Sequence, residues 1–98
     1  MNLSGKQKSF LRKLAQTLKP IFQIGKDGLS DTLSVQILNY LKKYELVKVS
    51  VLDTCPIEKT ELIHSIETAG MNVVQTIGKT IVLYRPSYEL ASKIELPR

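Results

Sequence analysis

The sequence predicts an α/β fold with the element order α-β-α-β-α-β-β. Stretches in which apolar residues recur every three to four positions alternate with short runs rich in β-branched residues. The connections between them are short, as in strand-helix-strand units with right-handed crossovers. No linker or low-complexity segment divides the 98 residues. We therefore expect a two-layer sandwich in which helices pack on a mixed four-stranded sheet.

The first predicted helix covers residues 4–18, with Ser4 as a candidate N-cap. Its apolar stripe has a 3.6-residue period and consists of Phe10, Leu11, Leu14, Ala15 and Leu18. A short strand over residues 21–24 follows. We expect the rings of Phe10 and Phe22 to lie in the core, whereas the pattern does not place the four tyrosines.

The second predicted helix begins after Ser30, which suits an N-cap. Its inward-facing residues are Leu33, Ile37, Leu38 and Leu41, and Lys42 and Lys43 lie near its end, where cations suit the helix dipole. Residues 47–51 then alternate valine with polar residues, which predicts a half-buried strand.

The third helix is predicted to begin at Pro56, a residue favoured at the first helical position, and to end at Gly70. Residues 71–77 and 80–84 are two β-rich runs joined by Gly78-Lys79, which predicts a hairpin. Residues 86–98 have weak periodicity and two prolines, and we expect a loosely held tail there.

The tetrad Gly25-Lys26-Asp27-Gly28 is the most informative local feature. Two glycines three positions apart let the backbone turn tightly and approach a ligand closely. The helix that begins after Ser30 offers free N–H groups and a dipole that attract anions. A cation between two glycines at such a place suits the phosphates of a nucleic acid, although an Asp-Gly pair is also common in simple turns.

The charge is unevenly distributed along the chain. Residues 1–50 hold nine Lys and Arg against three Asp and Glu, whereas residues 51–98 hold five against six. The first six charged residues are all cations: Lys6, Lys8, Arg12, Lys13, Lys19 and Lys26. A solvated helix normally carries both signs, so this asymmetry favours a binding face for nucleic acid.

Enzymatic and metal-binding motifs are weak. Gly78-Lys79-Thr80 imitates the end of a phosphate-binding P-loop, but Val73 stands where the first glycine belongs. His64 has no second histidine nearby, and the single Cys55 excludes an internal disulfide or a cysteine cluster. We expect no catalytic residues, no metal and no cofactor, and we take Cys55 and His64 as structural residues.

Four blocks of the sequence together resemble a known family. They are residues 3–8 (LSGKQK), 24–30 (IGKDGLS), 45–49 (ELVKV) and 75–86 (QTIGKTIVLYRP). In this order they are similar to the CRM domain, the chloroplast RNA splicing and ribosome maturation module, in its free-standing bacterial YhbY-like form. The resemblance implies a fold like the C-terminal domain of translation initiation factor three. It also implies RNA binding through the GxxG loop and an association with precursors of the large ribosomal subunit.

The expected RNA-binding residues combine the tetrad, the basic first helix and two cations of the hairpin. They are Gly25, Lys26, Asp27, Gly28, Lys6, Lys8, Arg12, Lys13, Lys19, Lys79 and Arg85. We expect residues 1–86 to form one RNA-binding domain, with residues 87–98 as a tail. The partner would be RNA, most specifically ribosomal RNA, with no membrane and no small-molecule substrate. A cytoplasmic monomer is expected.

A second hypothesis remains open at the level of the sequence. The same basic face could dock on an acidic surface of a protein partner. Binding to ribosomal RNA freed of protein would separate this alternative from RNA binding.

Overall fold

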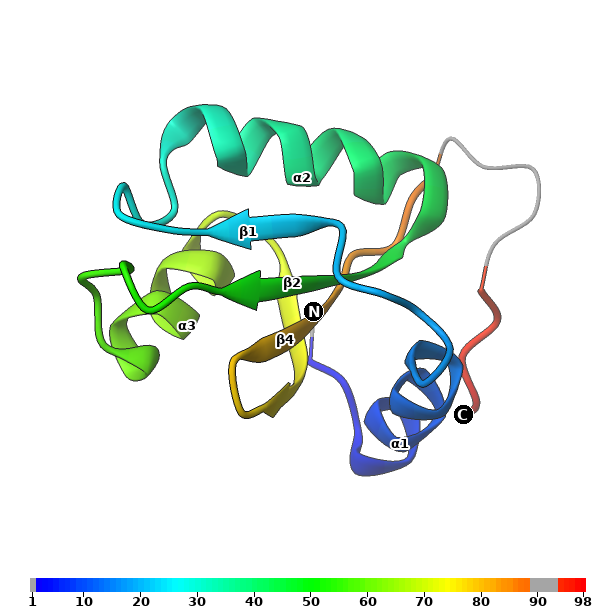
Figure 1. Cartoon of the computed structure of the whole chain (residues 1–98). Coiled ribbons are helices and arrows are strands. Elements are labelled where there is room, and N and C mark those ends of the chain that lie inside the picture. Colours follow the sequence, from blue (N-terminus) through cyan, green and yellow to red (C-terminus); the bar gives the residue numbers. More distant parts are fainter. Residues whose placement is uncertain (1, 89–93) are drawn as a thin grey trace.

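The structure, a computed structural model, describes residues 2–88 and 94–98 and confirms the predicted element order. Figure 1 shows the arrangement of these elements. The helices are α1 (Gly5–Ala15), α2 (Asp31–Tyr44) and α3 (Lys59–Thr68). The strands are β1 (Phe22–Ile24), β2 (Leu46–Val51), β3 (Asn72–Ile77) and β4 (Thr80–Tyr84).

The four strands form one mixed sheet in the order β1-β2-β4-β3. β1 runs parallel to β2, whereas β4 is antiparallel to both β2 and β3. Val49 of β2 lies between Phe22 of β1 and Ile81 of β4. The predicted mixed four-stranded sheet and the predicted β3–β4 hairpin are therefore confirmed.

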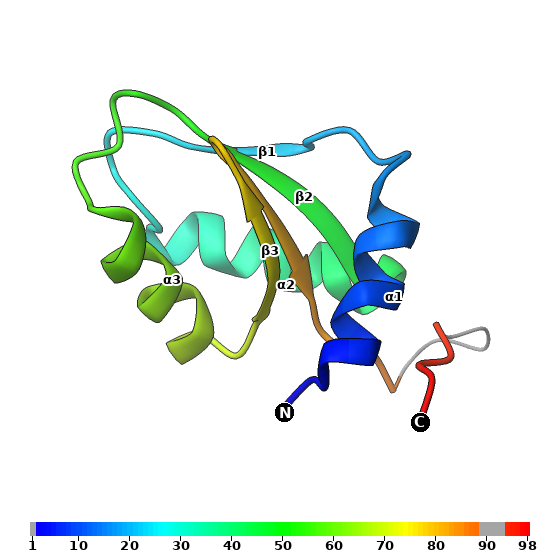
Figure 2. The ribbon, with the colours of Figure 1, turned by 90° about the horizontal axis from the view of Figure 1, so that it is seen from below.

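Helices cover both faces of the sheet. α2 and α3 pack on one face, where Ile37, Leu41, Leu62 and Ile66 meet alternate residues of β2 and β4 in the main core. α1 packs on the opposite face through Leu11 and Ala15, against a second cluster that includes Val74, Val82 and Tyr84. Figure 2 shows α1 and the pair α2 and α3 on different sides of the strands. The expected arrangement of two layers therefore did not include one feature of the structure, a partial third layer formed by α1.

α1 is shorter than predicted. It begins with a capping box, in which the Ser4 hydroxyl accepts from the Gln7 N–H at 3.1 Å and the Ser4 N–H donates to Gln7 Oε1 at 3.0 Å. It ends at Ala15, so Leu18 lies beyond it. Leu14 and Leu18 are 41% and 37% exposed, so these two residues of the predicted apolar stripe are not buried. Phe10 is only half-buried and belongs to neither core cluster, whereas Phe22 packs against the main core.

α3 begins at Lys59, so the predicted start at Pro56 was wrong. Residues 55–57 instead form a connection in which Cys55 and Ile57 pack against the main core. The predicted end is confirmed, because Gly70 has a positive φ of 96° directly after the helix.

The described part of the tail is held in place, contrary to the expectation of a loose segment. The buried carboxylate of Glu45 accepts the Ser87 N–H at 2.8 Å and the Ile94 N–H at 2.7 Å. Farther on, the Pro97 carbonyl accepts from Gln7 Nε2 of α1 at 3.1 Å. Ile94 and Leu96 also pack against the α1 cluster. Residues 89–93 lie outside the described residues.

Candidate nucleic-acid interface

The tetrad forms a tight turn after β1. The Gly28 N–H donates to the Gly25 carbonyl at 2.9 Å, and Gly28 adopts a left-handed φ of 61°. Lys26 and Asp27 are exposed at the tip of the turn, whereas Gly28 is buried. The turn therefore presents one cation and one carboxylate to solvent.

Of the two glycines of the tetrad, Gly28 packs tightly against the connection between β2 and α3. A Cβ at Gly28 would lie 2.7 Å from Ile57 Cδ1, so the end of the Ile57 side chain would have to move. A Cβ at Gly25 would lie 3.4 Å from Leu52 Cδ1, which is an ordinary van der Waals contact. The sequence pattern alone did not reveal these supporting residues, because they come from a segment some 25 to 30 positions later in the chain.

The start of α2 lies next to the tetrad. Ser30 is its N-cap, as predicted, and the Ser30 hydroxyl accepts the Leu33 N–H at 3.1 Å. The N–H groups of the first turn have no intrahelical acceptor, and the helix dipole makes this end positive. Asp31 occupies the same first turn and opposes that field.

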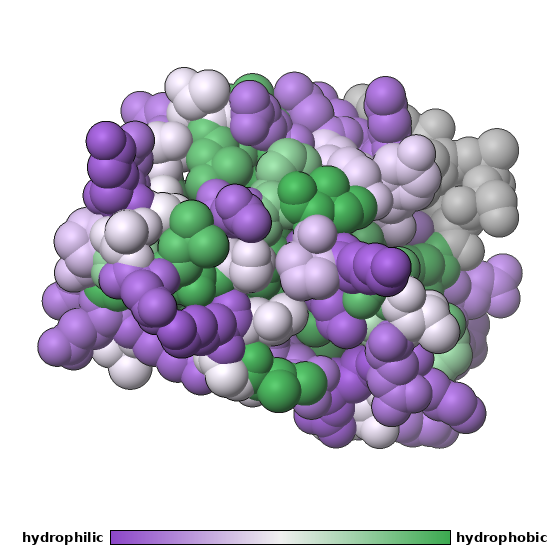
Figure 3. All heavy atoms as spheres, viewed as in Figure 1, coloured by the Kyte–Doolittle hydropathy of each residue, from purple (hydrophilic) through white to green (hydrophobic). Residues whose placement is uncertain are grey.

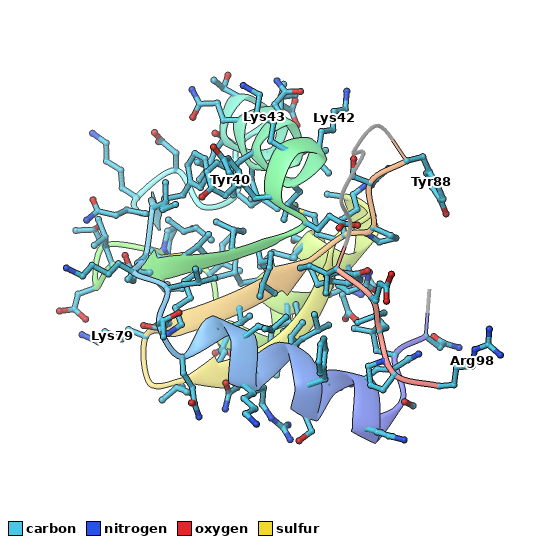
Figure 4. All side chains as sticks on the ribbon, turned by 90° about the vertical axis from the view of Figure 1, so that its right-hand side faces the viewer. Tyr40, Lys42, Lys43, Lys79, Tyr88 and Arg98 are labelled. Carbon is cyan, nitrogen blue, oxygen red and sulfur yellow. The ribbon has the colours of Figure 1, made fainter. Side chains whose placement is uncertain are left out.

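The hairpin tip lies at the same end of the sheet as the tetrad. The Val51 N–H donates to the Lys79 carbonyl, and the Leu52 N–H donates to the Ile24 carbonyl at 2.8 Å. The exposed Lys79 ammonium pairs with Asp53. Figure 4 shows Lys79 at the periphery of the molecule. Because Lys79 and Lys26 each have a carboxylate nearby, this end of the sheet is only weakly positive.

α1 supplies the more strongly basic surface. It carries Lys6, Lys8, Arg12 and Lys13 and contains no Asp or Glu. Arg12 and Lys13 are exposed and line a shallow groove of about 390 Å³ together with Gln75 and Ile77 of β3. Lys19 is exposed in the loop that follows α1.

Three predicted residues lie away from that groove. Lys6 donates from Nζ to the Arg98 carbonyl at 3.4 Å, and Lys8 lines a separate hollow that also contains Glu67. Arg85 lies at the opposite end of β4 from Lys79, and its guanidinium donates from Nη1 to the Gly70 carbonyl at 2.9 Å. The structure therefore does not bring Arg85 together with the tetrad, and it gives Arg85 a structural contact.

An aromatic group lies between β1 and the outer side of α2. The rings of Phe22 and Tyr40 meet edge to face with centroids 5.7 Å apart, and the rings of Tyr40 and Tyr44 are 4.5 Å apart at 35°. Figure 3 shows apolar surface between these two elements. Burial, and then the neighbouring Tyr44, raise the pKa of Tyr40. The spacing of Tyr40 and Tyr44 at i and i+4 was the available signal, but the contribution of Phe22 required the fold.

The other candidate chemistry is not assembled. Among residues 2–88 and 94–98, no group of three or more His, Cys, Asp or Glu is placed to hold a metal ion. Cys55 is half-buried against the main core, and His64 is exposed on α3. In the same described ranges, no helix has the length and apolar character needed to cross a membrane.

Comparison with known proteins identifies the family. Residues 3–85 match the CRS1 / YhbY (CRM) domain. The chain is 48% identical to the Bacillus subtilis protein YqeI, named a probable RNA-binding protein, over 97% of this chain and 99% of that one. It is 45% identical to a Haemophilus influenzae protein named RNA-binding protein, over 98% and 96% of the two chains.

A solved structure agrees with this result. The solution structure of a hypothetical Staphylococcus aureus protein, described as a candidate RNA-binding protein, superposes with a TM-score of 0.80. It has 44% sequence identity to this chain, and the match covers 98% of this chain and 100% of that one. With the matched domain, the relatives of nearly equal length and the shared fold, the chain belongs to the CRS1 / YhbY (CRM) domain family.

Proposed function

We propose that this protein binds RNA through phosphate contacts made chiefly by α1. The observation that carries the proposal is that α1 bears four cations and no acid, with Arg12 and Lys13 exposed beside a groove. Lysine and arginine clustered along a helix are the electrostatic signature of a nucleic-acid partner. The names of the bacterial relatives support RNA as that partner.

The tetrad is the second contact in this proposal. Its turn exposes Lys26 next to the first-turn N–H groups of α2, which suit one phosphate group. The hairpin tip with Lys79 lies at the same end of the sheet and extends that surface. Because phosphates carry no sequence information, selectivity would come from the shape of a folded RNA.

The RNA is, in this proposal, that of a precursor of the large ribosomal subunit. The support is the family resemblance, since ribosome maturation is part of what the CRM domain is named for. Residues 1–86 would form the RNA-binding unit of a monomeric, non-enzymatic protein in the cytoplasm. Residues 87–98 would brace α1 rather than contact RNA, as the bonds from Gln7 and Lys6 to the tail suggest.

Two experiments test these statements in turn. Purified protein is titrated against large-subunit ribosomal RNA stripped of protein; binding supports an RNA partner, and no binding at low salt favours an acidic protein surface instead. A cell lysate is then sedimented through a sucrose gradient and probed for this protein. Co-migration with immature large-subunit particles supports the ribosomal role, whereas recovery entirely in the soluble fraction contradicts it.

A further inference from the structure

The aromatic group between β1 and α2 forms an open surface rather than a closed core. Phe22 and Tyr40 are half-buried and pack against the main core, so their positions are fixed. Tyr44, the last residue of α2, is 57% exposed. Since one side of the Tyr44 ring rests on Tyr40, its other side is open to a ligand.

The residues around these rings complete a hollow of about 460 Å³. Its lining consists of Phe22, Tyr40 and Tyr44 together with Gln36, Asn39 and Lys43. The two amides can donate and accept hydrogen bonds, and Lys43 adds a cation. None of these six lining residues, all within the described part of the chain, is acidic. Figure 4 shows Tyr40 and Lys43 on α2, away from Lys79.

This combination matches what an unpaired nucleotide requires. Every base has an aromatic face that stacks on a tyrosine or phenylalanine, and an adjacent cation pairs with the phosphate. The Tyr40 hydroxyl adds no negative charge beside a phosphate, because a tyrosine is neutral at physiological pH and burial raises the pKa of Tyr40 further. An acidic protein segment would use Lys43, but it would leave three clustered rings and two amides without a matching group.

We propose that Phe22, Tyr40 and Tyr44 form a stacking platform for an unpaired base of the bound RNA. This inference rests on the proposed RNA-binding function and adds a single-stranded segment as the ligand of this surface. α2 begins beside the tetrad, and Tyr44 lies thirteen residues after Asp31. At 1.5 Å per residue the two points are roughly 20 Å apart, a span of about six stacked nucleotides. One strand could therefore place a phosphate at Lys26 and a base at Tyr44.

The test compares single-stranded and double-stranded RNA on the intact protein. The probes are a single-stranded oligoadenylate of about ten nucleotides, which has no base pairs, and a blunt RNA duplex. We expect Tyr44→Ala to weaken binding of the single strand about 5- to 30-fold. Tyr44→Phe should stay within about twofold of wild type because it keeps the ring. Neither variant should change duplex binding, and Tyr88→Ala is the control for loss of an exposed tyrosine elsewhere.

The outcomes separate this inference from the proposed function. Ultraviolet crosslinking of the oligoadenylate, read by mass spectrometry, should place the crosslink on Tyr44, Tyr40 or Phe22. If Tyr44→Ala binds the single strand as tightly as wild type does, the stacking platform is overturned. Salt-sensitive binding of the duplex would in that case still support the proposed function. If wild type binds neither probe, both are overturned.

Discussion

Gly28 lies so close to Ile57 that no other residue fits there without a shift. A Cβ at Gly28 would be 2.7 Å from Ile57 Cδ1, and the φ of Gly28 is 61°, a conformation that side chains rarely adopt. The second glycine of the tetrad thus fixes the turn against the connection between β2 and α3. An RNA that binds at this loop would therefore meet Lys26 and Asp27, which are exposed.

Gly28→Ala should destabilise the protein for two separable reasons. The left-handed φ costs about 1–3 kcal/mol for a residue with a side chain, and the shift required of the Ile57 Cδ1 methyl group, the flexible end of that side chain, adds a smaller cost. Gly78→Ala is a matched control, because Gly78 has a φ of 54° but open space around it. Urea denaturation should show a larger loss of unfolding free energy for Gly28→Ala.

A second substitution isolates the contact with Ile57. Ile57→Val shortens the side chain that meets the new methyl group, so it should recover part of the loss in the double variant. Equal losses for Gly28→Ala and Gly78→Ala, with no recovery from Ile57→Val, would show that the close approach has no energetic role.

Lys26→Ala should separate RNA binding from folding. Lys26 is exposed at the tip of the turn, so its removal should change the free energy of unfolding by less than about 0.5 kcal/mol. Loss of one phosphate contact should weaken binding of all RNAs alike and reduce the salt slope by roughly 0.7 to 0.9. Lys42→Ala, an exposed cation near the end of α2, controls for net charge. If the two variants bind RNA with the same affinity, the tetrad is only a structural turn and not a contact site.

Glu45 is expected to hold the described part of the tail. It is 1% exposed, has a φ of 63°, and its carboxylate accepts the N–H groups of Ser87 and Ile94. Glu45→Ala should cost about 2–4 kcal/mol because two hydrogen bonds to a charged group are lost. Glu45→Gly loses the same bonds but relieves the backbone, so it should be less damaging than Glu45→Ala. Amide hydrogen exchange at Ser87 and Ile94 should accelerate in both, and unchanged exchange would contradict this role.

Stability should fall at alkaline pH through Tyr84. Burial raises the pKa of Tyr84, and the nearby Glu45 and Tyr88 raise it further. The unfolded chain therefore loses this proton first, near pH 10, and the contribution is fully present below that pH and lost above it. Tyr40, whose pKa is also raised, acts in the same direction. Tyr84→Phe should flatten the decline in unfolding free energy above about pH 10. If the decline is as steep in Tyr84→Phe as in wild type, groups other than Tyr84 cause it.

Local signals in the sequence predicted the helices and strands well where interactions between nearby residues determine them. Ser30 caps α2 because its hydroxyl reaches Leu33, three residues away. Gly70 ends α3 because it adopts a positive φ. The predictions that failed concern features that depend on contacts between residues far apart in the sequence. Leu14 fits the helical period but is exposed, because α1 meets the sheet only along the line of Leu11 and Ala15.

The candidate site shows the same division. The tetrad and the basic helix could be read from residue types, and the i and i+4 spacing of Tyr40 and Tyr44 was visible as well. The ion pair of Lys79 with Asp53 joins residues 26 positions apart, and Arg85, which follows β4, contacts Gly70 in the connection between α3 and β3. No local pattern indicates these partners. Only the fold therefore shows which of the predicted cations are engaged in contacts within the protein.

A salt titration of two charge-matched variants tests most directly the proposal that the cations of α1 make most of the contacts with RNA. One reverses Arg12 and Lys13 to glutamate; the other reverses Lys42 and Lys59, which are exposed on α2 and α3, for the same change in net charge. With four or five phosphates neutralised, log affinity of wild type for RNA should fall against log salt with a slope of roughly −3 to −4. We predict that the α1 variant loses much of both the affinity and the slope, while the other stays closer to wild type. A salt-independent affinity, or equal losses in the two variants, would contradict the account.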